Sequence, residues 1–131
     1  MPIALDFRED GHVIYARMSD PLTGQDLTNA FTAQIPYYNN AAFQVHQIIN
    51  VEGLKKFPTG IFAVRRASPA LNHPNRGLAL VVGANPFVRS ITESIFRLAH
   101  YEGIQFLKTD DEAWDFVHMV MAEETLVFKS G

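Results

Sequence analysis

The sequence predicts a single α/β domain with a mainly parallel sheet, and three observations lead to this fold class. The chain opens with two strand-like segments joined by Asp10-Gly11, as in a β-hairpin. Segments with strand and helix periodicity then alternate along the chain, which favours crossover connections between parallel strands. Residues 78–82 are continuously apolar, as in a central strand that is covered on both faces.

The composition fits one compact domain over residues 1–131. A chain of 131 residues with 47% hydrophobic residues is long and apolar enough for one core. The formal net charge of -3 argues against a nucleic-acid surface, which needs a basic excess. The chain has no cysteine, so disulfides and thiolate ligands are excluded. Since no segment resembles a signal peptide or a membrane span, we expect a cytoplasmic protein without integral membrane association.

The first two predicted strands form the hairpin. Ile3, Leu5 and Phe7 alternate with other residues, which is the period of a half-buried strand. Asp10-Gly11 supplies the turn, because glycine tolerates the positive φ that hairpin turns require. Residues 13–18 then form the returning strand, antiparallel to the first.

Four helices and three further strands are expected after the hairpin. Thr23 caps the first helix, and Pro36 with Asn39-Asn40 closes it. The later elements follow in chain order: a strand at 43–51, a helix at 59–67, a strand at 78–82, a helix from Asn85-Pro86 to Gly103, a strand at 104–107, and a helix that opens with the capping box Thr109-Asp110-Asp111-Glu112. The tail, residues 125–131, is either frayed or packed on the surface.

The strand patterns also predict how the sheet is covered. Only the strand at 78–82 is apolar on both sides, whereas the other strands alternate. Helices should therefore cover one face fully and the other in part. The sparsely covered face is a candidate for self-association as a homodimer.

No motif identifies a catalytic, metal or cofactor site. The five histidines lack the spacing of metal ligands, and Gly83-Ala84-Asn85-Pro86 matches no phosphate-binding motif. We therefore expect no enzyme, no metal and no cofactor. An enzyme stays open as a third interpretation, which would gain support if His46 or His73 lay within hydrogen-bond reach of an exposed Ser, Thr or carboxylate.

The segment with the strongest functional signal is residues 50–60. It leads from the end of a predicted strand to the start of a helix, where parallel sheets commonly place their binding sites. The candidate residues for binding a partner or ligand are Asn50, Glu52, Lys55, Thr59 and Gly60. Asn50 and Glu52 would shape the loop, Lys55 would offer a charge, and Thr59 with Gly60 would open the helix. Thr59 is also a candidate phosphorylation site, against the simpler role of a helix cap.

The chain resembles the SpoIIAA-like group, which includes STAS domains (sulphate transporter and anti-sigma-factor antagonist modules) and bacterial STAS/SEC14-like proteins. The best local matches are residues 46–54, 77–83 and 109–114. The resemblance implies a sheet of four or five strands with packed helices, and non-enzymatic roles in partner switching or ligand sensing. Together with the order of elements, it predicts a SpoIIAA-like, mainly parallel five-stranded sheet with an N-terminal antiparallel hairpin and four helices. At the turn that carries the phosphorylated hydroxyl in such regulators, Pro58 stands at the acceptor position and Phe57 at the acidic one. Only Thr59 keeps a hydroxyl there.

Two interpretations of the binding role follow. The first is a regulatory protein-interaction module, in which a protein partner is expected. The second, suggested by the SEC14-like relatives, is a binder of a small apolar ligand or lipid. Tyr37-Tyr38 and Phe57 lie beside prolines in predicted loops and form either an apolar recognition patch or part of the core.

Overall fold

The computed structural model describes residues 3–55, 73–98 and 103–130, and it confirms the predicted fold class. The strands are β1 (Ile3–Arg8), β2 (Val13–Ser19), β3 (Val45–Gly53), β4 (Arg76–Val82) and β5 (Ile104–Leu107). They form one sheet in the order β1-β2-β3-β4-β5, in which β1 is antiparallel to β2 and the other neighbours are parallel. This is the predicted mainly parallel five-stranded sheet with an N-terminal hairpin.

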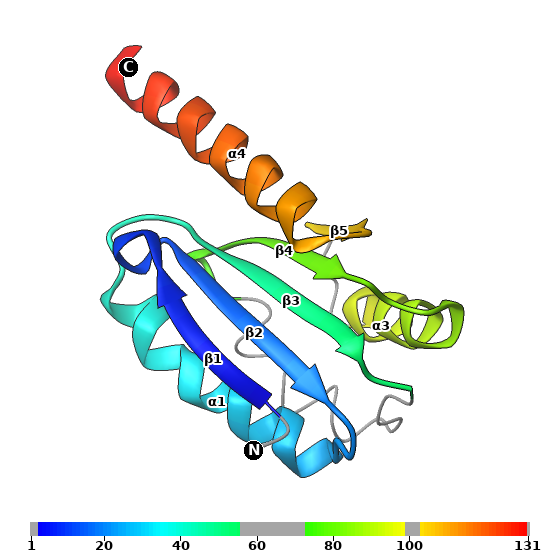
Figure 1. The fold of residues 1–131 in the computed structure, drawn as a ribbon. Helices are drawn as coiled ribbons and strands as arrows, with labels where there is room; N and C mark the ends of the chain where they lie inside the picture. Colours follow the sequence, from blue (N-terminus) through cyan, green and yellow to red (C-terminus); the bar gives the residue numbers. More distant parts are fainter. Residues whose placement is uncertain (1–2, 56–72, 99–102, 131) are drawn as a thin grey trace.

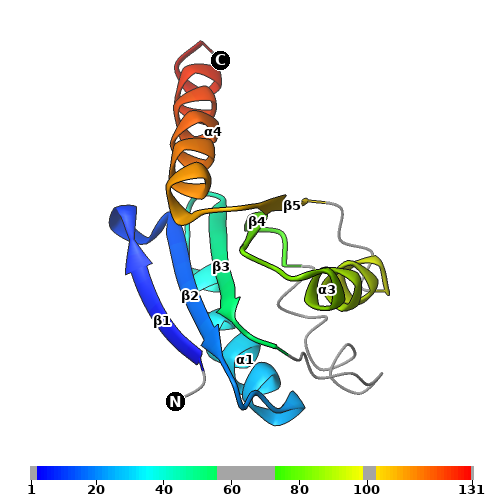
Figure 2. The same ribbon diagram turned by 45° about the vertical axis from the view of Figure 1, so that its right-hand side comes forward.

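The helices lie on both faces of this sheet. The α-helices of the described part are α1 (Gly24–Asn40), α3 (Pro86–Leu98) and α4 (Asp110–Ser130). The described part of the chain thus holds three α-helices rather than the four expected, and the expected helix at 59–67 lies outside it. Residues 125–130 of the predicted tail continue α4, which ends at Ser130. Figures 1 and 2 show α1 and α3 on one face, and α4 on the other with its C-terminal part projecting past the sheet.

Two apolar clusters explain why the helices pack in this way. On the face of α1 and α3, Leu27 and Phe31 pack with Ile49 and Val81 of the strands. On the opposite face, Val117 of α4 packs with strand residues of the other parity, such as Ile48 and Leu80. Strand β4 is fully buried from Ala79 to Val82, as its continuous apolar run predicted.

As expected, α4 covers its face of the sheet only in part. It packs against β3, β4 and β5 and contacts β2 through Tyr15, whereas Ala4 and Asp6 of β1 are exposed. Among the described residues, no helix is both long enough and apolar enough to cross a membrane.

The helix ends follow the sequence signals closely. The hydroxyl of Thr23 accepts from the backbone N of Asp26 over 3.1 Å, and the Asp26 carboxylate accepts from the backbone N of Thr23 over 3.0 Å. The side chain of Asn85 likewise accepts from the backbone N of Val88 over 2.8 Å at the start of α3. Local capping therefore sets where α1 and α3 begin.

The hairpin turn has an unusual backbone. A short 3-10 turn, η1 (Glu9–Gly11), joins β1 to β2. Gly11 has a φ of 87°, as the turn prediction required, but Glu9 and Asp10 also have positive φ, at 55° and 54°. Since residues other than glycine, asparagine and aspartate rarely adopt a positive φ, Glu9 carries local strain.

Candidate functional site

The candidate site lies at the edge where the parallel strands end. Because β2 to β5 run in the same direction, their carboxyl ends meet along one edge of the sheet. Asn50, Glu52 and Lys55 lie along the end of β3 and the residues that follow, so the structure places them at this edge. Thr59 and Gly60 fall outside the described residues.

Asn50 is a fixed part of this edge. Its side chain is only 3% exposed, and both ends of the amide are engaged. Nδ2 donates to Oδ1 of Asp110 over 2.9 Å, and Oδ1 accepts from the backbone N of Glu52 over 3.0 Å. Asn50 therefore shapes the exit of β3 and joins it to the first residue of α4.

Asp110 is the centre of a polar cluster that sequence reasoning missed. Its Oδ2 accepts from the Tyr15 hydroxyl over 2.9 Å and lies 3.7 Å from Nη2 of Arg17. We call Tyr15, Arg17, Asn50 and Asp110 the Asp110 cluster. The cluster brings together the ends of β2 and β3 and the start of α4.

Arg17 is the solvent-facing member of the Asp110 cluster. Its side chain is 64% exposed, and Nη2 donates to the Tyr15 hydroxyl over 3.2 Å. This hydrogen bond, with a smaller contribution from the charges of Asp110 and Glu52, raises the pKa of the Arg17 guanidinium above its ordinary value. Arg17 is therefore a permanent positive charge at the surface of the candidate site.

Glu52 and Lys55 add exposed charges of opposite sign. The stem of Glu52 lies against Gly83, where an added Cβ would overlap Cγ of Glu52. The backbone N of Lys55 donates to Oδ2 of Asp20 over 2.8 Å, which ties the segment after β3 to the loop after β2. The edge thus presents mixed charges on a backbone that hydrogen bonds hold in place.

His46 is buried under α4, and both of its ring nitrogens are engaged. Nδ1 accepts from the backbone N of Leu78 over 3.0 Å, and Nε2 lies 2.5 Å from Oε1 of Glu124. Because Nδ1 accepts from a backbone N–H, the proton of the neutral ring is on Nε2 and is donated to Glu124. A carboxylate near His46 is one of the observations that would favour an enzyme. This imidazole, however, is 3% exposed and has no nitrogen left for a substrate.

His73 is engaged in a similar way. Its Nε2 lies 2.7 Å from Oδ1 of Asn39, and its Nδ1 accepts from the backbone N of Asn75 over 3.1 Å. Within the described ranges, no group of three or more histidine, aspartate or glutamate side chains is placed to hold a metal ion.

A second polar cluster lies on the opposite face, between α1 and the beginnings of β3 and β4. Oε1 of Gln34 accepts from the Tyr38 hydroxyl over 3.0 Å and from Nε2 of Gln47 over 2.7 Å. Oε1 of Gln47 in turn accepts from Nη2 of Arg76 over 2.6 Å. All four side chains are buried, and we call them the buried amide cluster. Burial raises the pKa of Tyr38, although the positive charge of Arg76 opposes the shift.

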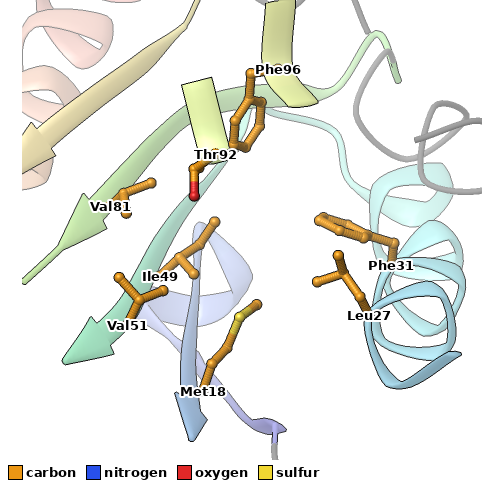
Figure 3. Close-up of a pocket in the computed structure, with 8 residues that line it drawn as sticks. All are labelled: Met18, Leu27, Phe31, Ile49, Val51, Val81, Thr92 and Phe96. Atoms are coloured by element: carbon orange, nitrogen blue, oxygen red, sulfur yellow. The ribbon is translucent and has the colours of Figure 1, made fainter. Parts of the chain in front are cut away.

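An apolar cavity lies between the sheet and the helices α1 and α3. Its lining side chains point toward one another in Figure 3; they are Met18, Leu27, Phe31, Ile49, Val51, Val81, Thr92 and Phe96. The hydroxyl of Thr92 donates to the backbone O of Val88, so it does not make the cavity polar. The cavity volume is about 20 Å³, which is close to the space of one water molecule.

The comparisons with known proteins support the fold. No protein-family model and no curated protein matches the sequence. A solved structure that resembles this one is described as an anti-sigma-factor antagonist (STAS) domain protein from Planctomyces limnophilus. The similarity has a TM-score of 0.57 at 13% sequence identity and covers 85% of this chain and 93% of that chain. The chain therefore has the SpoIIAA-like fold of STAS domains, as its sequence predicted.

Proposed function

We propose that this chain is a non-enzymatic STAS-like module that binds a protein partner through the carboxyl edge of its sheet. The supporting observation is that both ends of the Asn50 amide are hydrogen-bonded, which fixes the end of β3 relative to the start of α4. Glu52 and Lys55 are exposed on this fixed backbone, so partner binding costs little conformational entropy.

The charge pattern of the edge suits a polar protein surface. The edge carries the basic residues Arg17 and Lys55 together with the acidic residues Asp20, Glu52 and Asp110, so both signs of charge are present. Such a pattern selects a partner by complementary charges rather than by a general attraction to polyanions. Because the similar structure is described as an anti-sigma-factor antagonist, an anti-sigma factor in a bacterial signalling pathway is our first candidate. We expect this interaction to take place in the cytoplasm.

Phosphorylation of Thr59 would regulate the same edge. An added phosphate would bring up to two negative charges to the segment that follows β3 in sequence and would change which partner surface fits. The two histidines considered for catalysis are both engaged by hydrogen bonds, which supports binding rather than chemistry as the role of the chain.

Site-specific photo-crosslinking in the native cells tests this proposal. A photoreactive amino acid replaces Glu52 in one variant and Met119 in a control variant, since Met119 is similarly exposed on α4 away from the edge. We expect a defined crosslinked protein from position 52 that is missing from position 119. Identical products from both positions, or none from position 52, would contradict the proposal.

Native mass spectrometry of protein taken from the same cells tests the remaining expectations. A mass increase of one phosphate, located at Thr59 by fragmentation, supports regulation at the edge. A dimer would support self-association through the partly covered face of the sheet. Fully monomeric, unmodified protein under all growth conditions would contradict both.

A small apolar ligand is the second candidate function, and the apolar cavity favours it. The accessible part of its lining is apolar, and the Thr92 hydroxyl already donates to Val88, so the cavity suits an acyl chain. At about 20 Å³ the cavity holds such a ligand only if α1 and α3 move apart. A lipid of defined mass retained during native mass spectrometry supports this function. If the lipid is removed and position 52 still crosslinks to its partner, the two candidate functions are independent of each other.

A further inference from the structure

Gly83 follows β4 and begins the turn that leads to α3, and two separate observations require a glycine there. Its φ of 73° lies in the left-handed region, which residues with a Cβ disfavour. An added Cβ would also overlap Cγ of Glu52 and lie 3.2 Å from its Oε1. The first requirement concerns the backbone of Gly83 itself, whereas the second concerns the side chain of a residue in the candidate site.

The backbone beneath Glu52 is held in place without this contact. The backbone N of Glu52 donates to Oδ1 of Asn50 over 3.0 Å. Two residues further on, the backbone O of Leu54 accepts from Nδ2 of Asn85 over 3.3 Å, and Leu54 itself is buried in the core. The contact with Gly83 therefore bears on the direction of the Glu52 side chain and not on the path of the chain beneath it.

The freedom of the Glu52 side chain matters because this side chain is exposed. A long side chain at the surface samples several rotamers, and binding a partner costs the entropy of fixing one of them. Since the stem of Glu52 lies against the Cα of Gly83, part of this freedom is already lost before a partner arrives. A Cβ at position 83 would turn the stem away, because a side chain changes rotamer more easily than the backbone moves.

We propose that Gly83 is a positioning residue of the partner-binding edge. By lacking a Cβ it lets the stem of Glu52 lie across the turn between β4 and α3, and it thereby sets the direction in which the Glu52 carboxylate meets the partner. This inference rests on the proposed function, since it requires that Glu52 contacts a protein partner. It adds to the site a residue that has no charge or side-chain hydrogen bond of its own.

The test is a double-mutant cycle that uses the protein captured by crosslinking from position 52, purified as the binding partner. Its dissociation constant is measured for the native chain, for Glu52→Ala, for Gly83→Ala and for the chain with both changes. We expect each single change to weaken binding by about fivefold, and both together by no more than about fivefold, because Gly83 acts through Glu52. Two independent effects would instead multiply to about 25-fold, which would overturn the proposal.

Gly11→Ala is the matched control for backbone strain. Gly11 also has a positive φ, of 87°, but an added Cβ there would meet Cζ of Phe43 at 4.0 Å, which is an ordinary contact. Its substitution strains the backbone without displacing a side chain, and it lies at the end of the sheet opposite to the candidate site. We expect Gly11→Ala to leave the dissociation constant unchanged. Equal weakening by Gly11→Ala and Gly83→Ala would mean that lost stability causes the effect, and this would overturn the proposal.

Gly83→Asn keeps the test valid if Gly83→Ala is unstable. Asparagine tolerates the left-handed region better than alanine but carries the same Cβ, so it should also weaken partner binding by about fivefold. A measurement without the partner tests the geometry directly. The native chain should show an NOE between the Hα protons of Gly83 and the Hγ protons of Glu52, and its absence would overturn the proposal.

The proposed function and this inference fail in different ways. If the native chain captures no protein from position 52, the proposed function is contradicted and the inference is overturned with it. If a partner is captured but binds Gly83→Ala and Gly83→Asn as tightly as the native chain, only the inference is overturned and the proposed function stands.

Discussion

The Asp110 cluster and the buried amide cluster tie helices to opposite faces and opposite ends of the same sheet, yet they differ in their access to water. Gln34, Tyr38 and Gln47 exchange hydrogen bonds inside the protein, out of contact with solvent. Asp110 also accepts hydrogen bonds from a buried amide and a hydroxyl, but the exposed guanidinium of Arg17 lies beside it. A buried polar group must find its partners within the fold, whereas water replaces a lost partner at the surface. The first cluster is thus suited to fixing the structure, and the second can change its contacts during binding.

The largest effect is expected from Gln34→Leu. Oε1 of Gln34 accepts two hydrogen bonds, so the change leaves the Tyr38 hydroxyl and Nε2 of Gln47 buried without this acceptor. We expect the free energy of unfolding to fall by about 3 kcal/mol, measured by urea denaturation. Ala33→Leu, at an exposed position of the same helix, is the control and should change little. A loss below about 1 kcal/mol for Gln34→Leu would show that water enters the buried amide cluster.

Asp110→Ala should have a smaller effect, because its cluster is partly solvated. The change removes the acceptor of Asn50 Nδ2 and of the Tyr15 hydroxyl, and we expect a loss of about 2 kcal/mol in thermal or urea denaturation. Asp111→Ala removes a carboxylate from the same first turn without these contacts, and it should cost about 0.5 kcal/mol through the helix dipole. Equal losses for the two variants would mean that the Asn50 contact contributes nothing.

Tyr38→Phe tests the buried amide cluster by pH. At neutral pH the loss of one hydroxyl should cost about 1 kcal/mol. Because burial raises the pKa of Tyr38, the folded state holds the phenol proton more firmly than the unfolded state, which releases it near pH 10. The stability from this proton is complete below about pH 10 and is lost as the pH rises through the folded pKa.

Urea denaturation between neutral and alkaline pH measures this dependence. The native chain should lose more stability than Tyr38→Phe above about pH 10, since the variant lacks the ionising group. Parallel losses in the two proteins would contradict the assigned direction of the shift.

The smallest effect on stability is expected from Arg17→Gln. The side chain is mostly exposed, and its hydrogen bond to Tyr15 is open to water, so thermal denaturation should show no measurable change. The same variant should weaken partner crosslinking from position 52, because it removes a permanent charge from the edge. A clear loss of stability with unchanged crosslinking would make Arg17 a structural residue and would remove it from the candidate site.

Most of the fold was predictable from local signals. Alternation in residues 3–8 and 43–51 identified strands, although β3 is buried on both faces from Val45 to Val51 and not only on one. Thr23 and Asn85 marked helix starts because capping depends on neighbouring residues. Pro36 suggested that Tyr37-Tyr38 belongs to a loop. The structure keeps Pro36 inside α1, which still ends at Asn40, so the two tyrosines point in different directions.

The site was predictable only in part. Asn50, Glu52 and Lys55 were expected at a strand end, and they lie there, whereas Thr59 and Gly60 remain predictions. The contact between Asn50 and Asp110 joins residues 60 positions apart, and no local sequence pattern predicts it. Asp110 is also in a capping segment, which is a sufficient local reason for its charge. Polar clusters of this kind depend on the tertiary arrangement and become visible only when the strands and helices are placed.

Gly77 has no side chain, and this affects how the packing of α4 on the sheet can be measured. An added Cβ would overlap the His46 ring, so the absence of a side chain lets the imidazole settle against β4 and accept from Leu78. Its single proton is then enclosed between the sheet and Glu124. The NMR resonance of this N–H therefore reports whether α4 is packed on the sheet. It should persist while the helix stays in contact with the sheet and disappear when the helix moves away, even if the sheet remains intact.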